Sequence, residues 1–200
     1  VKNDSEKVDK IHHLTSEKCK EWLKAYKDDL DDNQKEFSES TTNYKNIIEG
    51  LNRYAITKVG SSYVKALSNE DYDKYIREID TIYSDGLSFY DALSYYNKKD
   101  YNKAYALLGA IEDTNVFYDK ATSYKNKVIT NVISILRKDI TKVSKDIDTM
   151  DDEAKLSKYL QIEELILKYD NIYTNLNLKS NKDYNALLSE YRDKIEDLSN

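Results

Sequence analysis

Two histidines and one cysteine near the start of the chain are the residues best suited to metal or nucleophilic chemistry. His12, His13 and Cys19 carry the nitrogen and sulfur atoms that bind zinc, and a cysteine beside a histidine can act as a nucleophile. Neighbouring histidines point to different faces of a helix, the sequence has no second cysteine, and no Gly-rich turn presents Cys19. We therefore expect no metal, no cofactor and no catalytic residue.

Acidic residues gather in "DDLDDN" at 28–33 and in "DTMDDE" at 148–153. A calcium loop needs alternating acids, a central Gly and a terminal Glu, and neither segment has them. The second segment is typical of a turn in which Asp151 or Asp152 caps the next helix. Paired carboxylates such as Glu163 and Glu164 serve acid–base chemistry only in a water-poor pocket, and nothing in the sequence places them there. The sequence thus predicts that the chain is not an enzyme.

Tyrosine is abundant, with 19 Tyr against 3 Phe, and four tyrosines are candidates for an interaction patch. Consecutive helical residues diverge by about 100 degrees, so we expect one of Tyr95 and Tyr96 in the core and the other partly exposed. The exposed ring, near Tyr90 or Tyr105, could form an aromatic patch for a peptide or a glycan. The alternative is a tyrosine-rich core whose hydroxyls reach the surface.

Composition favours a folded, all-α chain. The 200 residues include no Pro and only 4 Gly, residues that sheet proteins need repeatedly at their turns. The net charge is -6 and both signs are interspersed, so no basic stripe is available for nucleic acid. No apolar run approaches the roughly 20 residues that cross a bilayer, so we expect no membrane contact by this segment.

Apolar residues recur at steps of three and four, which predicts long helices. The longest stripe runs from Tyr118 to Met150, about 35 residues or about 50 Å at 1.5 Å per residue. Further stripes cover Leu156 to Leu176, Tyr184 to Leu198 and Tyr72 to Leu93. Narrower stripes, as in a two- or three-stranded coiled coil, include Trp22, Leu23, Tyr26, Leu30 and Phe37, then Tyr44, Ile48, Leu51, Ala55 and Val59.

These stripes predict an elongated set of antiparallel helical hairpins or a bundle. We expect an N-terminal long-helix hairpin at 1–67 and a second region at 68–200, which together could form one continuous helical domain. The second region combines a central helical hairpin with a long three-helix bundle.

Three short stretches look alike: "SNEDYDKY" at 68–75, "NKKDYNKA" at 97–104 and "SNKDYNAL" at 180–187. Each pairs Ser or Asn with Asp three residues later, the spacing of a capping box at a helix start. The pairs are Ser68 with Asp71, Asn97 with Asp100, and Ser180 with Asp183. Their unequal intervals argue against a repeat of fixed period, so we expect three helix N-termini.

The middle stretch belongs to a segment, about 88–121, that resembles one tetratricopeptide repeat. The order of small, aromatic and apolar residues carries the resemblance: Ala92, Tyr95, Tyr101, Ala104, Leu108 and Ile111. The early Trp and the terminal Pro of that family are missing, and no second unit follows. The resemblance implies a closely packed helical hairpin around Ala92 and Ala104. A peptide groove of that family needs about three stacked repeats, so no binding residue carries over.

Helical segments with a "kDYnkAy" turn are similar to extracytoplasmic domains of Gram-positive lipoproteins and membrane-anchored proteins. The chain opens without Met, which leaves open a signal peptide or an anchor removed upstream. Our leading hypothesis is a non-enzymatic spacer or protein-interaction module, with a protein or peptide partner, at the surface of a Gram-positive bacterium. The alternatives are a ligand-sensing ectodomain of a membrane receptor and a cytoplasmic helical adaptor.

Overall fold

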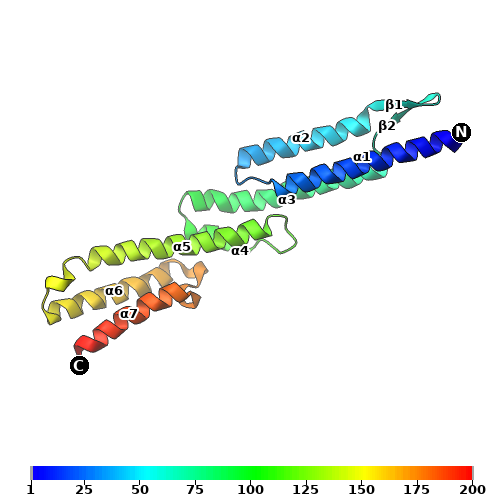
Figure 1. The fold of residues 1–200 in the computed structure, drawn as a ribbon. Helices are drawn as coiled ribbons and strands as arrows, with labels where there is room; N and C mark the ends of the chain where they lie inside the picture. The colour runs from blue at the N-terminus through cyan, green and yellow to red at the C-terminus, as the bar shows by residue number, and fades with distance from the viewer. Residues whose placement is uncertain (1, 200) are drawn as a thin grey trace. The chain divides into compact units, whose positions relative to one another are not determined.

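The computed structural model describes residues 2–199 and is all-α apart from one short β-hairpin, which confirms the predicted fold class (Figure 1). The α-helices are α1 (Lys2–Asp28), α2 (Gln34–Arg53), α3 (Asn69–Asn97), α4 (Tyr101–Gly109), α5 (Tyr118–Val143), α6 (Asp152–Ile172) and α7 (Lys182–Ser199). The strands are β1 (Ala55–Val59) and β2 (Ser62–Lys65), and the short 3-10 helices are η1 (Ile147–Thr149), η2 (Thr174–Leu176) and η3 (Leu178–Ser180).

The chain forms two compact units, unit 1 (Val1–Tyr90) and unit 2 (Asp91–Asn200), and α3 contributes to both. Unit 1 therefore extends past the boundary at 67 and 68 that the sequence suggested. The reason is that the first part of α3 completes the core that α1 and α2 begin. Whether 1–67 and 68–200 behave as separate domains stays a prediction.

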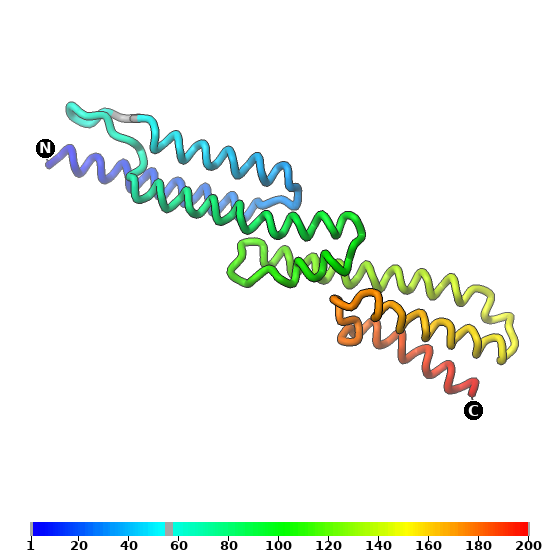
Figure 2. Tube along the Cα trace, turned by 180° about the vertical axis from the view of Figure 1, so that it is seen from behind, coloured from blue at the N-terminus to red at the C-terminus, as the bar shows by residue number. Residues whose placement is uncertain are grey.

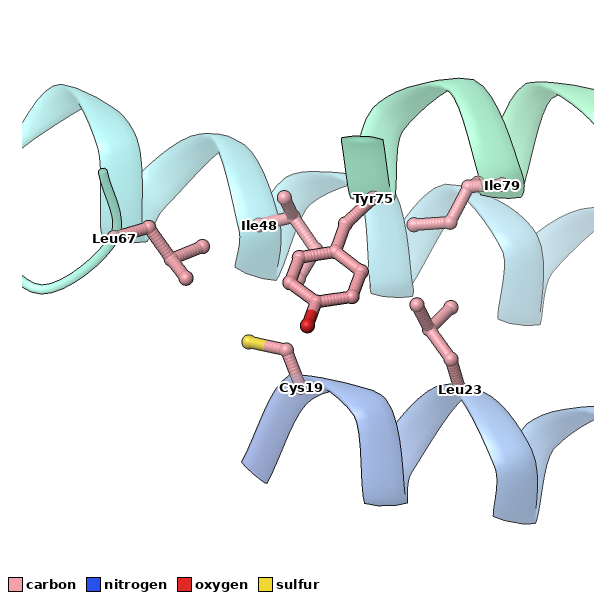
Figure 3. Close-up of a cluster of buried hydrophobic side chains, with 6 residues drawn as sticks. All are labelled: Cys19, Leu23, Ile48, Leu67, Tyr75 and Ile79. Atoms are coloured by element: carbon pink, nitrogen blue, oxygen red, sulfur yellow. The ribbon is translucent and has the colours of Figure 1, made fainter. Parts of the chain in front are cut away.

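Unit 1 is a bundle of α1, α2 and the first part of α3. One side of each helix is apolar, because its large side chains recur every three or four residues, and these sides meet in a common core. Figure 3 shows the centre of this core, where a thiol and a tyrosine ring lie among aliphatic side chains. The cluster consists of Cys19, Leu23, Ile48, Leu67, Tyr75 and Ile79.

A β-hairpin joins α2 to α3, where the sequence predicted that the helix of α2 would continue. The helix ends at Arg53, so Ala55 and Val59 lie in β1 and not on a helical stripe. β1 and β2 are antiparallel, and Val59 opposes Ser62 across a two-residue turn. Gly60 opens this turn with φ 61°, a left-handed value that glycine adopts at little cost. The Asp4 carboxylate would also lie 3.0 Å from a Cβ at this position.

Unit 2 is built around α5, α6 and α7, which follow one another through short connections (Figure 2). α6 packs against α5 and α7, and the shorter α4 packs against α5. α4 also contacts η2 through two asparagines. The Asn175 backbone N–H donates to Asn102 Oδ1 (3.0 Å), and Asn175 Nδ2 donates to the Asn102 carbonyl (3.1 Å). This double hydrogen bond ties α4 to the end of α6.

The stripe from Tyr118 to Met150 is not one helix of about 35 residues. α5 ends at Val143, and Asp146 adopts a left-handed conformation (φ 62°) before η1. A left-handed residue cannot continue a right-handed helix, so the apolar spacing persists while the helix stops. α6 likewise ends at Ile172 and not at Leu176, although Leu176 is buried within η2.

The three similar stretches do begin helices, as predicted, but only one uses the predicted pair. Asp71 N donates to Ser68 Oγ (3.1 Å) at the start of α3. α4 is capped by Asp100 itself, which accepts from Lys103 N, whereas Asn97 ends α3. Asn181, not Ser180, caps α7 by accepting from the N–H groups of residues 183 and 184. At the starts of α4 and α7, two different residues each offer a side-chain oxygen that could cap the helix. The sequence spacing alone does not show which of the two residues is the cap.

The segment with the tetratricopeptide resemblance is a helix-turn-helix. The end of α3 leads through Lys99, which has φ 62°, into α4. Ala92 and Ala104 are completely buried, which agrees with the small side chains expected where helices pack closely. The relationship to that family stays a prediction.

Candidate functional site

The residues suited to metal or thiol chemistry are not assembled into a site. His12 Nε2 lies 3.2 Å from the Lys65 carbonyl, and His13 is exposed on another side of α1. Cys19 is completely buried, and burial, followed by the charge of Asp71, raises the pKa of its thiol to about 11. A thiol that holds its proton and is shielded from solvent is a poor nucleophile. Within residues 2–199, no three His, Cys, Asp or Glu side chains gather as metal ligands would.

The acidic segments serve as turns and caps. Asp151 accepts a hydrogen bond from Ala154 N (2.9 Å), which confirms the predicted cap of α6. In the turn between α1 and α2, Asn33 caps α2. A hydrogen bond with Asp31 raises the pKa of Glu36 beside this turn. Both acidic segments therefore have structural roles, as turns that lead into capped helices.

The paired carboxylates on α6 are also not in a water-poor pocket. Glu163 accepts from Arg192 Nε at 2.7 Å, which joins α6 to α7, and Glu164 is exposed. Neither carboxylate therefore has the enclosed surroundings that a pair of carboxylates needs for acid–base chemistry. Glu163 therefore links two helices, and Glu164 faces solvent.

Tyr90, one of the four candidate tyrosines, is buried in unit 1 and is not available as an exposed ring. It is 3% exposed, and its hydroxyl donates to the Asp31 carbonyl. Its ring contacts Phe37, with centroids 5.0 Å apart, and Phe89, at 5.3 Å. The expectation that Tyr90 contributes to a surface patch is therefore wrong. Helical spacing could not reveal this, because Phe37 and the turn at Asp31, which cover Tyr90, come from another part of the chain.

Tyr95 lies in unit 2 and is half-buried, with two lysine ammonium groups near its ring. Lys103 Nζ lies 4.0 Å from the ring centroid and Lys98 Nζ lies 5.5 Å from it. Lys103 Nζ also donates to the Tyr95 hydroxyl at 2.6 Å, and this contact raises the pKa of Lys103. We call these three residues, Tyr95, Lys98 and Lys103, the Tyr95 face.

Tyr96 contacts other aromatic rings. Its ring meets Tyr101 of α4 at 5.9 Å and Tyr124 of α5 at 5.1 Å, both edge to face, an arrangement that aromatic pairs favour. Asn131 Nδ2 donates to its hydroxyl at 3.0 Å. Tyr95 and Tyr96 are both half-buried, so the expectation of one partly exposed ring is met, but the expectation that the other lies in the core is wrong. Three elements meet at this point: Lys103 of α4 lies over the Tyr95 ring, whereas rings from both α4 and α5 contact Tyr96.

Tyr105 is the fourth candidate and lies on another side of α4. It is half-buried, and Lys125 Nζ of α5 lies 5.3 Å from its ring centroid. Lys103 and Tyr105 are two residues apart on one helix, so their side chains point about 200° apart. The Tyr105 face, which we define as Tyr105 and Lys125, is therefore separate from the Tyr95 face.

The lysines are the residues that the sequence analysis missed. Lys98 follows Tyr95 by three positions, and Lys127 follows Tyr124 by three positions, with its Nζ 3.9 Å from that ring. This spacing places both members on one side of a helix and could have been found in the sequence. The pairs of Lys103 with Tyr95 and of Lys125 with Tyr105 join different helices, so no local pattern reveals them.

Within the part of the chain that the structure describes, these lysines also differ from others of unit 2 in their lack of an acidic partner. Among residues 2–199, Lys98, Lys103, Lys125 and Lys127 have no ion pair within 4.0 Å. Lysines elsewhere in unit 2, such as Lys142 and Lys179, are paired with aspartates. The junction of α3, α4 and α5 thus combines half-buried tyrosines with cations that lack an acidic partner.

Comparison of the chain with known protein families, with curated proteins and with solved structures finds no match.

Proposed function

We propose that the chain is a non-enzymatic helical interaction module that binds a protein partner at the junction of α3, α4 and α5. One observation carries this proposal: four lysines without an ion pair lie over half-buried tyrosine rings at this junction. Tyrosine is enriched at protein interfaces, because its ring buries a large apolar area and its hydroxyl can remain hydrated. A lysine over such a ring brings a charge to the same small area.

Other tyrosines of unit 2 show what a purely structural role involves. Tyr184 is completely buried, and its hydroxyl donates to the Ile166 carbonyl at 3.0 Å. Tyr169 is also buried and donates to Asp139 at 2.6 Å. Both hydroxyls find partners inside the fold. Tyr95 differs, because its ring is only half-buried and its hydroxyl partner is an exposed lysine.

The proposed setting is the envelope of a Gram-positive bacterium, where such a module would also act as a spacer. Support for it comes from the "kDYnkAy" type of helical segment and from a lone cysteine that is kept inside the core. Within residues 2–199, no helix has both the length and the apolar content needed to cross a bilayer. Fractionation of the producing cells separates this setting from that of a cytoplasmic adaptor.

Site-specific photo-crosslinking tests the proposed interaction. A photoreactive amino acid at Asn97, an exposed residue next to Lys98 at the end of α3, should form one discrete adduct with a partner in the cells that make the protein. The same amino acid at Lys145, which is exposed and follows the end of α5, is the control and should not form that adduct. No adduct at Asn97, or the same adduct from both positions, would overturn the proposal.

A further inference from the structure

We propose that the Tyr95 face binds carboxylates of an acidic peptide segment in the partner, an inference that rests on the proposed function. The two ammonium groups of this face, on Lys98 and Lys103, lie near the same ring, at 5.5 Å and 4.0 Å from its centroid. Because both distances are measured from the same centroid, the two ammonium groups lie no more than about 9.5 Å apart. Like charges at such a distance repel each other unless an anion or solvent screens them. A carboxylate at this position would relieve the repulsion and complement both charges.

The acids close to this face leave its two cations without ion pairs. The Asp100 carboxylate accepts from the Lys103 backbone N–H at 3.2 Å and is held there as the cap of α4. The charges of Asp100 and Asp91 also favour the charged form of Lys103 and so raise its pKa, although neither carboxylate forms an ion pair with it. Lys99, in the turn between the helices, is exposed and adds a third positive charge. Within residues 91–103, the three lysines therefore outnumber the two aspartates, Asp91 and Asp100.

Charge complementarity favours an acidic peptide over a nucleic acid. Single-stranded nucleic acids bind through aromatic rings whose faces are open for base stacking. Here Lys103 Nζ covers a face of the Tyr95 ring, so the face presents ammonium groups to a ligand. The chain as a whole carries a net charge of -6, which repels any anion in proportion to the charge that the anion carries. This repulsion is stronger for a long polyphosphate backbone than for a short segment with a few carboxylates.

The test is a titration of the whole chain with a fluorescein-labelled, glutamate-rich peptide, followed by anisotropy and by amide NMR shifts. We expect weak binding, with shifts concentrated at residues 95–103. Raising the salt from about 50 to about 300 mM should weaken binding about tenfold, because exposed charges are screened over a few ångströms at higher salt. A glutamine version of the peptide should not bind.

A charge-matched pair of variants locates the interaction. Lys98→Gln with Lys103→Gln should weaken peptide binding about tenfold, since each exposed ion pair contributes a factor of about two to five. Lys138→Gln with Lys145→Gln removes the same charge from two exposed lysines of unit 2 and should leave binding unchanged. Both variants keep all buried side chains, and circular dichroism checks that they fold.

Three results would overturn the inference. These are equal loss of binding in the two double variants, shifts outside residues 95–103, and tighter binding of an oligothymidine than of the acidic peptide. If the crosslink at Asn97 persists while the peptide fails to bind, the junction still contacts a partner and only the ligand class is wrong. If the crosslink is absent as well, the proposed function itself fails.

Discussion

Tyrosine side chains have different contacts in the core of unit 1 and at the junction of α3, α4 and α5 in unit 2. In unit 1, tyrosine hydroxyls reach partners inside the bundle: Tyr75 donates to the Ser16 carbonyl (2.9 Å), and Tyr26 bonds to Thr41. At the junction, lysine ammonium groups lie over the Tyr95 and Tyr105 rings. The first arrangement satisfies a buried polar group and closes the core. The second leaves a polar and charged surface, which is where we propose that a partner binds.

The difference shows that the abundance of a residue type does not indicate its role. What separates the two regions is the partner of each hydroxyl and the depth of each ring. Tyr75 is 2% exposed, whereas Tyr95 remains half-buried. A candidate interaction residue is therefore better chosen by what its polar atom contacts than by its spacing along a helix.

Removing one tyrosine from each region should give the largest contrast. Tyr75→Ala should destabilise unit 1 by about 3 to 5 kcal/mol, because it leaves a cavity among Cys19, Ile48 and Ile79. Tyr95→Ala should cost no more than about 1.5 kcal/mol, since its ring is only half-buried and loses mainly the contacts with its lysines. Urea unfolding followed by Trp22 fluorescence measures the first change, and circular dichroism measures the second.

A matched control for this contrast is Tyr75→Phe, which keeps the ring and removes the hydroxyl. It should cost about 1 kcal/mol, the usual contribution of one hydrogen bond. Equal costs for Tyr75→Ala and Tyr95→Ala would show that the two regions do not differ as described.

A larger side chain on the buried side of α4 should have the next largest effect. It tests whether α4 packs closely against its neighbouring helices at the junction. Ala104 is completely buried, so Ala104→Leu should cost about 1 to 3 kcal/mol in urea unfolding. Ala106 lies on the same helix and is exposed, so Ala106→Leu adds the same side chain without a clash and should change stability by less than about 0.5 kcal/mol. Equal stability of the two variants would contradict the close packing of α4.

The smallest expected effect concerns the sealed core of unit 1 at alkaline pH. Burial raises the pKa of Cys19 to about 11 from its ordinary value of 9.0. Above pH 9 the unfolded chain therefore releases the thiol proton while the folded chain retains it, so stability falls as pH rises. At pH 10 this contribution is about 1.4 kcal/mol relative to pH 7. Cys19→Ala should lack that part of the pH dependence, and parallel profiles for variant and wild type would refute it.

Much of the fold could be predicted from the sequence, because the absence of Pro and the three-and-four spacing determine the helices directly. The residues at which the helices end were harder to predict. Ile48, Leu51 and Ala55 continue a helical spacing, yet the helix ends at Arg53 because a hairpin with Gly60 at its turn follows. Val143 and Ile147 continue another spacing across the left-handed Asp146. Periodicity records which residues face a core, not whether the backbone between them is helical.

The candidate site could be predicted only in part. Tyr95, Tyr96 and Tyr105 do lie near one another in sequence and reach the surface, but Tyr90 is covered by Phe37 and by the turn at Asp31. Such coverage depends on tertiary packing. Lys103 was missed for the same reason, since its contact with Tyr95 crosses from one helix to another. The spacing of Lys98 from Tyr95, three residues, is local and could have been found in the sequence.

The double hydrogen bond between Asn102 and Asn175 joins positions 73 residues apart. Bringing together such distant parts of a chain costs entropy that must be offset before the contact gains anything. The free energy of two hydrogen bonds is too small to offset that loss alone. We therefore expect α5 and α6 to form first and to bring Asn102 and Asn175 together. This contact is therefore expected to form late in folding and to break early in partial opening. The Asn175 amide would then exchange its hydrogen with water before the buried amides of α5.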